Sequence, residues 1–331
     1  LAWPGCIYRP VKSFLSCKIW SMRLVVSGVA CGHSADRYRL GNTGAVMPSS
    51  VERKGAARLP VLWRDEHLAA IFKPAGWLVH RTGLDAGETR FVVQTLRQQL
   101  GQPVYPVQRL DKGTCGVLVL ALSSAAARSL CEAFAQHLVH KSYLAVVRGW
   151  APEQAWVDHP LRPDDAPADA APQTAYTRLR CLARLEWPES FDGRFSSTRL
   201  SLVHAEPLTG RRHQIRRHLK HLAHPILGDA THGKGPLNRW WAQRCGLHRL
   251  WLHAWSLQLP HPVTGAAVHF PSGLLLPAHT CTEPLLDTSS AFVADITPWQ
   301  DWQRLLWRHG WQWMEGAQME GAGAGVAFAP R

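Results

Sequence analysis

Residues 108–124 read QRLDKGTCGVLVLALSS, and the middle of this stretch decides the fold. Residues 117–122 form a continuous apolar run, which is typical of a strand that is buried on both faces. The two serines that follow are good helix N-caps, and they predict a helix that extends to about Leu138. Asp111 lies just ahead of the strand. A charged turn therefore leads directly into the predicted core.

Patterns on either side of this strand predict the other elements. Short apolar runs indicate strands, and apolar residues at helical spacing indicate helices. The predicted strands cover residues 61–63, 68–72, 143–147, 174–185 and 196–205, with a hairpin over 249–259 and 267–270; the predicted helices cover 91–100, 211–223 and a segment from 299, after a cap and a proline at 297–298. Strands and helices do not alternate regularly along the chain. This order predicts an α+β fold with a mixed, largely antiparallel sheet and flanking helices.

The composition points to a nucleic-acid partner. The 331 residues include 37 Lys+Arg and 24 Asp+Glu, which gives a formal net charge of +13. This imbalance favours a polyanion, either nucleic acid or an acidic membrane surface. No stretch approaches the roughly 18 apolar residues that span a bilayer, which excludes an integral membrane protein. The eight cysteines are scattered without a C-x-x-C pair, which favours a reducing, cytoplasmic location over a disulfide framework or a zinc ribbon.

The same patterns divide the chain into segments. We expect residues 1–58 to be a poorly ordered N-terminal extension or upstream sequence, and residues 59–285 to form one catalytic domain. Residues 286–315 are expected to form a C-terminal helical segment, and residues 316–331 a disordered tail. A short apolar run before Cys31 leaves a lipoprotein signal as a less favoured interpretation of the N-terminal segment.

Asp111 is a candidate catalytic residue. An extended approach to the strand puts Arg109 and Asp111 on one face and Leu110 on the other. A carboxylate held beside cations can act as a nucleophile. The alternative is an aspartate in a surface turn that forms an ion pair, which is the commoner role of a single Asp.

A second candidate is the basic segment over residues 209–221. Ile215, Leu219 and Leu222 fall at i, i+4 and i+7, so a helix here packs one apolar stripe against the core. No acidic residue occurs between residues 211 and 228, and we expect the positive charge of the helix to lack a local counter-charge. This favours contact with phosphates over a merely solvated basic face.

Two other features carry less weight. Four histidines between residues 213 and 224 suggest a metal site, but no two of them are four residues apart and no Cys or acid is close, so we expect no metal. Tyr143 begins a strand and is a core residue by default. It matters for chemistry only if the fold brings it against Asp111.

Taken together, the motifs resemble the pseudouridine synthase family that contains the large-subunit ribosomal synthase A type. The matching residues are RLDxxTxG at 109–116, KxY at 141–143, GRxHQIR at 210–216, HPILGD at 224–229, LHA at 252–254 and HP at 261–262. They occur in the family's order and spacing within residues 59–275. Two positions depart from the pattern: Gln108 stands where the family usually has His, and Cys115 where it usually has Ser. A thiol is a weaker hydrogen-bond partner than a hydroxyl for the turn that holds Asp111.

The resemblance implies an RNA-modifying isomerase that detaches uracil from its ribose through N1, rotates it and rejoins it through C5. Asp111 would be the nucleophile or the base that removes the ribose C2′ proton, and Arg216 would pair with it and keep it ionised and aligned. Tyr143 would stack on the displaced base and assist proton transfer from C5. Arg109 would fill the space left by the flipped uridine. The other RNA-binding residues would be Arg211, Arg212, His213, Arg217 and Lys220. The resemblance implies no metal and no cofactor, and the sequence indicates no obligatory protein partner.

A narrower resemblance predicts the target RNA. KPAGWLVHR at 73–81, LD at 84–85, RRHL at 216–219, HG at 232–233 and NR at 238–239 are similar to members of the family that modify uridine 65 in the T stem of tRNA. Two alternatives stay open: the same reaction on 23S rRNA, and a non-enzymatic RNA-binding factor that keeps the basic face. A metal-dependent nuclease is less favoured, because no cluster of carboxylates accompanies Asp111.

Overall fold

The computed structural model describes residues 57–81, 87–164, 167, 169–277 and 299–315. The expectations for residues 1–56, for the boundary at residue 285, for the cap and proline at 297–298 and for the tail at 316–331 lie outside the described residues. Within the described residues, no helix has the length and apolar character needed to cross a membrane.

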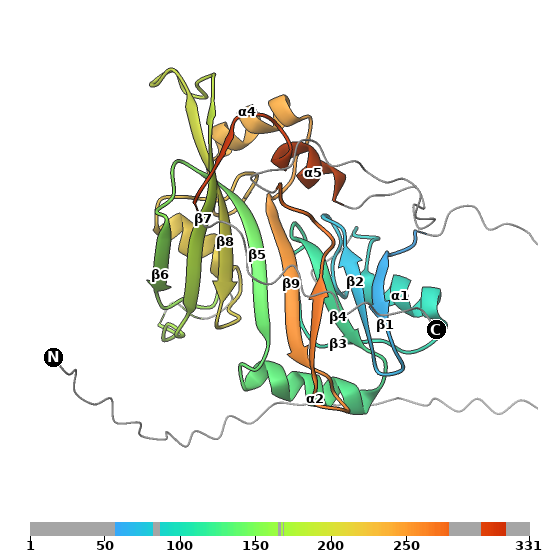
Figure 1. Ribbon diagram of the computed structural model, residues 1–331. Helices are drawn as coiled ribbons and strands as arrows, with labels where there is room; N and C mark the ends of the chain where they lie inside the picture. The colour runs from blue at the N-terminus through green and yellow to red at the C-terminus, as the bar shows by residue number, and fades with distance from the viewer. Residues whose placement is uncertain (1–56, 82–86, 165–166, 168, 278–298, 316–331) are drawn as a thin grey trace, which may run out of the picture. The chain divides into compact units, whose positions relative to one another are not determined.

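The described part of the chain is built on one sheet of eleven strands (Figure 1). In chain order the strands are β1 (Val61–Arg64), β2 (Leu68–Lys73), β3 (Tyr105–Pro106), β4 (Cys115–Ala121), β5 (His140–Arg148), β6 (Gln154–Asp158), β7 (Tyr176–Trp187), β8 (Thr198–Pro207), β9 (Leu252–Pro260), β10 (Ala267–Pro271) and β11 (Trp311–Trp313). The main path runs β1-β2-β4-β9-β5-β8-β7-β11, with β10 beside β9, β3 beside β4 and β6 beside β7. Only β4 and β9 pair in parallel among these described strands. The predicted mixed, largely antiparallel sheet is therefore confirmed.

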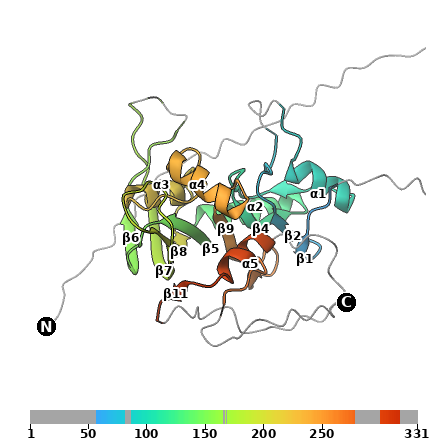
Figure 2. The same ribbon diagram turned by 90° about the horizontal axis from the view of Figure 1, so that it is seen from above.

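Five helices flank the sheet in the described residues. They are α1 (Val92–Leu100), α2 (Ser124–Ala135), α3 (Gln214–His221), α4 (Gly235–Cys245) and α5 (Gln300–Leu306). Figure 2 shows α5 on the opposite side of the sheet from α1, α3 and α4. Trp302 of α5 is buried, with its ring 5.3 Å from that of Trp251 between the ring centres. The sheet is therefore covered from both sides, which is what buries its central strands.

β4 is the strand that the apolar run at 117–122 predicts. All seven of its residues are buried, and so are all six residues of β2 beside it. One apolar cluster packs α1 and α2 against β2 and β4, and a second packs α3, α4 and α5 against β5, β7 and β8. β9 contributes residues to both clusters, so the contact between β4 and β9 joins the two halves of the core.

The junction of β4 and β9 lies next to the turn that carries Asp111. Cys115 lies opposite His253, and Gly116 lies opposite Ala254. Gly116 has a φ of +114°, and a Cβ at this position would lie 2.2 Å from the carbonyl oxygen of Ala254. Only glycine fits so close an approach of two backbones. The turn of Asp111 is thereby anchored at the centre of the sheet.

The basic helix α3 is shorter than the sequence pattern predicts. It covers Gln214–His221 rather than residues 211–223. His213 has a φ of +55°, a left-handed conformation that does not continue a right-handed helix. The arginines before it therefore lie in a turn. α2 likewise ends at Ala135, before the predicted end near residue 138.

One helix and three short strands are absent from the sequence-based prediction. α4 carries ordinary helix signals, with a proline in its first turn and Gly246 in the left-handed conformation after its last residue. The unpredicted strands β3, β6 and β11 lie outside the main path or at its end. Such strands have few neighbours, so their pairing depends on tertiary contacts more than on their own pattern.

Candidate active site

A large cleft opens beside the turn that carries Asp111. Its volume is about 1700 Å³, and its walls include residues 108–114, 209–216 and 228–231 together with Tyr143. Pockets for small molecules have volumes of about 300–1,000 Å³. The cleft is therefore sized for part of a polymer rather than for a small metabolite.

A buried lysine holds the turn of Asp111 in place. Lys73, the last residue of β2, is fully buried, and its ammonium donates hydrogen bonds to the carbonyl oxygens of Thr114 (2.6 Å), Lys112 (3.2 Å) and Pro74 (3.1 Å). Burial lowers the pKa of Lys73 to about 7, although the nearby carboxylate of Asp111 opposes this effect. Because two of these carbonyl groups belong to residues that closely follow Asp111 in the chain, Lys73 fixes the backbone that presents the carboxylate.

Arg216 connects two carboxylates. Its Nε and Nη2 donate to Oδ2 and Oδ1 of Asp229, each at 2.8 Å, and its Nη1 donates to Oδ2 of Asp111 at 2.9 Å. Burial disfavours the charge of Arg216, but the hydrogen bonds to Asp229 and Asp111 outweigh it and raise the pKa of the guanidinium. Burial also acts on Asp229, yet Arg216 and two backbone N–H groups hold its pKa below the usual value. The side chain of Asp111 is 29% exposed, so it remains accessible from the cleft.

Tyr143 lies on β5 and lines the same cleft as Asp111. Burial raises the pKa of its hydroxyl, and the carboxylate of Asp111 raises it further. The phenol is therefore protonated at neutral pH. Lys141, two residues earlier, donates a hydrogen bond to the carbonyl oxygen of Thr209 (2.9 Å) and ties β5 to the turn before α3. The fold thus brings Tyr143 and Asp111 to one cleft, which is the condition for a chemical role of the tyrosine.

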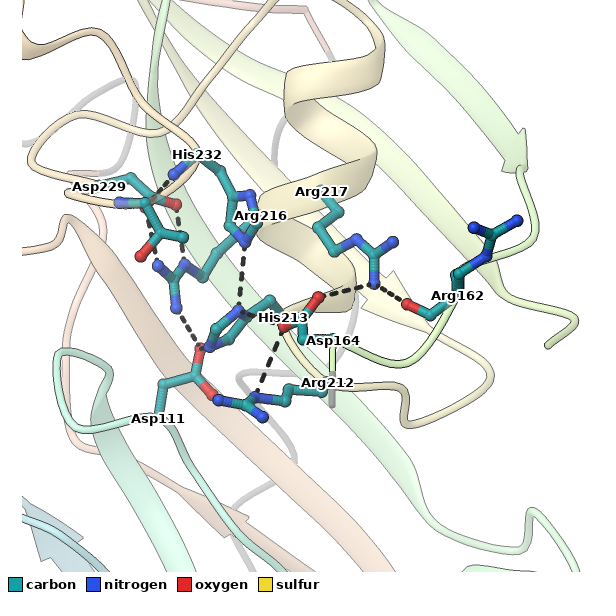
Figure 3. A network of polar contacts seen from close by, with 10 residues as sticks. Asp111, Arg162, Asp164, Arg212, His213, Arg216, Arg217, Asp229 and His232 are labelled. Carbon is teal, nitrogen blue, oxygen red and sulfur yellow. Dashed lines mark hydrogen bonds and ion pairs between the residues drawn. The ribbon is translucent and has the colours of Figure 1, made fainter. Parts of the chain in front are cut away.

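Three arginines and one histidine of the basic segment pair with acids from distant parts of the chain (Figure 3). Asp164, in the loop after β6, contacts Arg212 Nε (3.5 Å), His213 Nδ1 (3.3 Å) and Arg217 Nη1 (3.4 Å). Arg216 has the two carboxylates described above. The expectation that this segment lacks counter-charges is therefore wrong, because folding supplies acids that the local sequence does not contain.

The predicted RNA-binding residues fall into two hollows. The large cleft with Asp111 is lined by Arg109, Arg211, Arg212 and His213. A smaller hollow of about 440 Å³ is lined by Arg217 and Lys220, together with Asp164 and His232. Arg109, Arg212 and Lys220 are exposed, as a contact with RNA requires.

Gln214 is a supporting residue to which the sequence patterns assign no role. It is buried at the start of α3, and its Oε1 accepts hydrogen bonds from Thr209 Oγ1 (2.7 Å) and from the backbone N–H of Arg211 (3.0 Å). These bonds shape the turn that carries the arginines. Gln214, Asp229 and Lys73 all lie within the stretches that carry the family resemblance. A polar residue that lies in such a motif and is buried in the fold is a candidate for a supporting role.

The histidines at 218, 221 and 224 contact other groups of the protein. His218 is buried and contacts Thr177 Oγ1 (2.9 Å) and the carbonyl oxygen of His159 (3.0 Å). His221 stacks on the ring of His159, with 3.9 Å between the ring centres. His224 contacts a backbone carbonyl group at the end of β5. Among the described residues, no group of three His, Cys, Asp or Glu side chains is placed to hold a metal ion.

The two departures from the family pattern lie in different surroundings. Cys115 is buried, and its Sγ accepts a hydrogen bond from Arg249 Nη2 (2.8 Å) and contacts His253 Nδ1 (3.3 Å). Arg249 also pairs with Asp301 of α5 (3.0 Å), so Cys115 ties the start of β4 to that helix. Gln108 lines the cleft, and its buried Nε2 has no hydrogen-bond partner among the described residues.

Comparison with known sequences identifies the family. Residues 67–221 match the family model described as RNA pseudouridylate synthase. The tRNA pseudouridine synthase C of Yersinia pestis is 49% identical over 217 residues, which cover 63% of this chain and 84% of that protein. The protein of the same name from Vibrio cholerae is 46% identical over 223 residues, which cover 65% of this chain and 91% of that protein.

The fold has related solved structures. Human RNA pseudouridylate synthase domain containing 1 has a TM-score of 0.50 and 26% sequence identity, with 68% of this chain and 85% of that chain covered. Human RNA pseudouridylate synthase domain containing 4 has the same TM-score and identity, with 65% and 88% covered. These likenesses agree with the α+β architecture. From its sequence relatives and its fold, the chain belongs to the RNA pseudouridylate synthase family.

Proposed function

We propose that this chain isomerises uridine 65 in the T stem of tRNA to pseudouridine, in the cytoplasm. The names of the Yersinia pestis and Vibrio cholerae relatives support tRNA as the substrate class. Asp111 is bound by Arg216 and is accessible from a cleft that is large enough for part of a polymer. The wall of this cleft includes several basic side chains.

Asp111 is the reacting group of the proposed mechanism. In one route its carboxylate bonds to the ribose as the bond to uracil N1 breaks, and it leaves again when C5 forms the new bond. In the other it removes the ribose C2′ proton and later returns it. Both routes rearrange the atoms of one nucleotide, so neither needs a co-reactant. In both, the hydrogen bond from Arg216 holds the carboxylate in one orientation.

Tyr143 and Arg109 act on the displaced base and on the space it leaves. The protonated phenol of Tyr143 stacks on the detached uracil and assists the transfer of the C5 proton. Arg109 is exposed on the cleft wall next to the Asp111 turn, where it can enter the stem as the uridine flips out. The remaining RNA-binding residues contact phosphates on both sides of the flipped nucleotide; they are Arg211, Arg212, His213, Arg217 and Lys220.

A map of pseudouridine in total RNA tests the reaction and the target together. The map is made in a strain without this gene and in the same strain complemented with wild-type protein, with Asp111→Asn or with Asp158→Asn. Asp158 is exposed on β6 and serves as the matched control for the loss of one carboxylate.

We expect the strain without this gene to lack one T-stem pseudouridine. The wild type and Asp158→Asn should restore it, and Asp111→Asn should not. A modification lost from 23S rRNA instead would replace the proposed target while keeping the chemistry. Restoration by Asp111→Asn would favour a non-enzymatic RNA-binding factor.

A further inference from the structure

We propose that Asp164 occupies the place of an RNA phosphate and must be displaced when RNA binds. This inference rests on the proposed function, because it supposes that RNA lies over the basic segment. Asp164 then acts as an affinity-setting residue. It competes with the substrate for the same cations.

The geometry around Asp164 is that of an anion site already filled by a carboxylate (Figure 3). Its Oδ2 lies 3.5 Å from Arg212 Nε and 3.3 Å from His213 Nδ1, and its Oδ1 lies 3.4 Å from Arg217 Nη1. Arg217 also donates a hydrogen bond to the carbonyl oxygen of Arg162 (2.7 Å), two residues before Asp164. A phosphodiester offers two charged oxygens to the same donors, because arginine binds carboxylate and phosphate in the same way.

Two guanidinium groups meet the carboxylate of Asp164 at this site. Burial lowers the pKa of His213, although the carboxylates of Asp111 and Asp164 oppose this effect. Arg212 and Arg217 stay charged at every pH of interest, because a guanidinium does not lose its proton in proteins. Both therefore attract a polyanion that reaches them.

The contacts of Asp164 are open to exchange. Its side chain is 33% exposed, and those of Arg212 and Arg217 are 49% and 21% exposed. The pair with Arg212 is exposed enough to be weak, so a phosphate brought by an RNA held at other points can replace the carboxylate there first. The buried pair of Arg216 and Asp229 differs in this respect, because Asp229 is wholly inaccessible.

The position of the site fits a phosphate near the reacting nucleotide. His213 lies between the two acids: its Nε2 is 3.8 Å from Asp111 Oδ2, and its Nδ1 is 3.3 Å from Asp164 Oδ2. A phosphate in the place of Asp164 would therefore lie one imidazole ring away from the catalytic carboxylate. An RNA that presents its backbone correctly displaces Asp164, whereas a poorly placed RNA has to compete with it.

The experiment compares Asp164→Asn with wild type in equilibrium binding. The probe is a tRNA transcript in which a C–G pair replaces the pair at the target uridine, so that no turnover occurs. We expect Asp164→Asn to bind this RNA about 3- to 10-fold more tightly at low salt, because one exposed competing ion-pair cluster is removed. The gain should shrink at high salt.

A matched control separates local competition from a general change of charge. Asp169→Asn removes the same charge from the same loop at an exposed residue, and we expect its affinity to stay within about twofold of wild type, because the carboxylate that contacts Arg212, His213 and Arg217 is that of Asp164. The double variant Arg217→Gln/Asp164→Asn should show a smaller gain over Arg217→Gln than Asp164→Asn shows over wild type. Thermal unfolding checks that each variant is folded.

Asp164 either competes with RNA for the arginines or positions the arginines for RNA, and the two roles predict opposite changes in affinity. If Asp164 merely positions the arginines, Asp164→Asn binds RNA more weakly, and this result or an unchanged affinity would overturn the inference. An equal gain in Asp169→Asn would do so as well. Formation of pseudouridine by the wild-type protein is a separate observation, so a failure here leaves the proposed function standing.

Discussion

Asp229 binds the guanidinium of Arg216 at two points and leaves its third edge directed at Asp111. The two bonds to Asp229 are each 2.8 Å long, and the bond to Asp111 is 2.9 Å long. A bidentate pair of arginine and carboxylate fixes the plane of the guanidinium. Asp229 therefore orients Asp111 through Arg216, although Asp229 itself is almost completely buried in the cleft wall.

Replacing Asp229 by Asn tests this orienting role. The variant leaves the charge of Arg216 without its buried partner, so we expect the free energy of unfolding to fall by about 3 kcal/mol. We also expect the single-turnover rate to fall on the order of 100-fold, because the carboxylate of Asp111 loses its fixed direction. Urea unfolding and rapid-quench assays measure the two effects. A variant with the wild-type rate would show that Asp111 needs no such alignment.

Arg216→Lys separates charge from geometry. Lysine keeps the positive charge but cannot bind Asp229 at two points and Asp111 at a third. We expect kcat to fall by about tenfold or more while the Kd for RNA changes much less. Equal losses in binding and in rate would indicate that Arg216 serves mainly as a phosphate contact.

Lys73 provides a pH-dependent test of the turn that holds Asp111. The pKa of Lys73 falls from 10.5 to about 7 on folding, so the unfolded chain binds more protons between these values. The contribution of Lys73 to the free energy of unfolding therefore rises with pH between these two pKa values and does not change below pH 7. We expect the wild type to gain on the order of 2 kcal/mol over Lys73→Met between pH 7 and pH 9. Urea unfolding at both pH values measures the difference in free energy of unfolding between the wild type and Lys73→Met. If this difference is the same at both pH values, burial does not lower the pKa of Lys73.

Alanine substitutions at Gly116 and Gly101 test how closely β4 and β9 approach each other, with Gly101 as the control position. Both have positive φ, but a Cβ on Gly116 would lie 2.2 Å from Ala254, whereas a Cβ on Gly101 meets nothing within 4 Å. Gly101→Ala should cost about 1 kcal/mol, which is the penalty for the left-handed backbone alone. Gly116→Ala should cost several times more, with a clear loss of thermal stability. Similar melting temperatures for the two variants would contradict the close approach of β4 and β9.

The parts of the fold that the sequence predicts are those with a local cause. The apolar run at 117–122 lies in β4, and the stripe of Ile215 and Leu219 lies on the buried face of α3. Both patterns depend on neighbouring residues and on the periods of strand and helix. The family motifs likewise place Asp111, Tyr143 and Arg216 around one cleft.

The parts that the sequence does not predict depend on tertiary contacts. The local absence of acids after Arg211 suggests unbalanced charge, but Asp164 comes from the loop after β6 and supplies a counter-charge. The left-handed backbone of His213 shortens α3, and the role of Lys73 depends on where β2 ends beside the Asp111 turn. None of these contacts follows from spacing along the chain.

We propose that the carboxylate of Asp111 is required to convert a uridine of tRNA to pseudouridine. The most direct test of this proposal is the yield of pseudouridine at position 65 of an unmodified tRNA transcript, measured with purified protein in excess over RNA. We expect full conversion by the wild type and by Asp158→Asn, and no conversion by Asp111→Asn. Conversion by Asp111→Asn at the wild-type rate would contradict it.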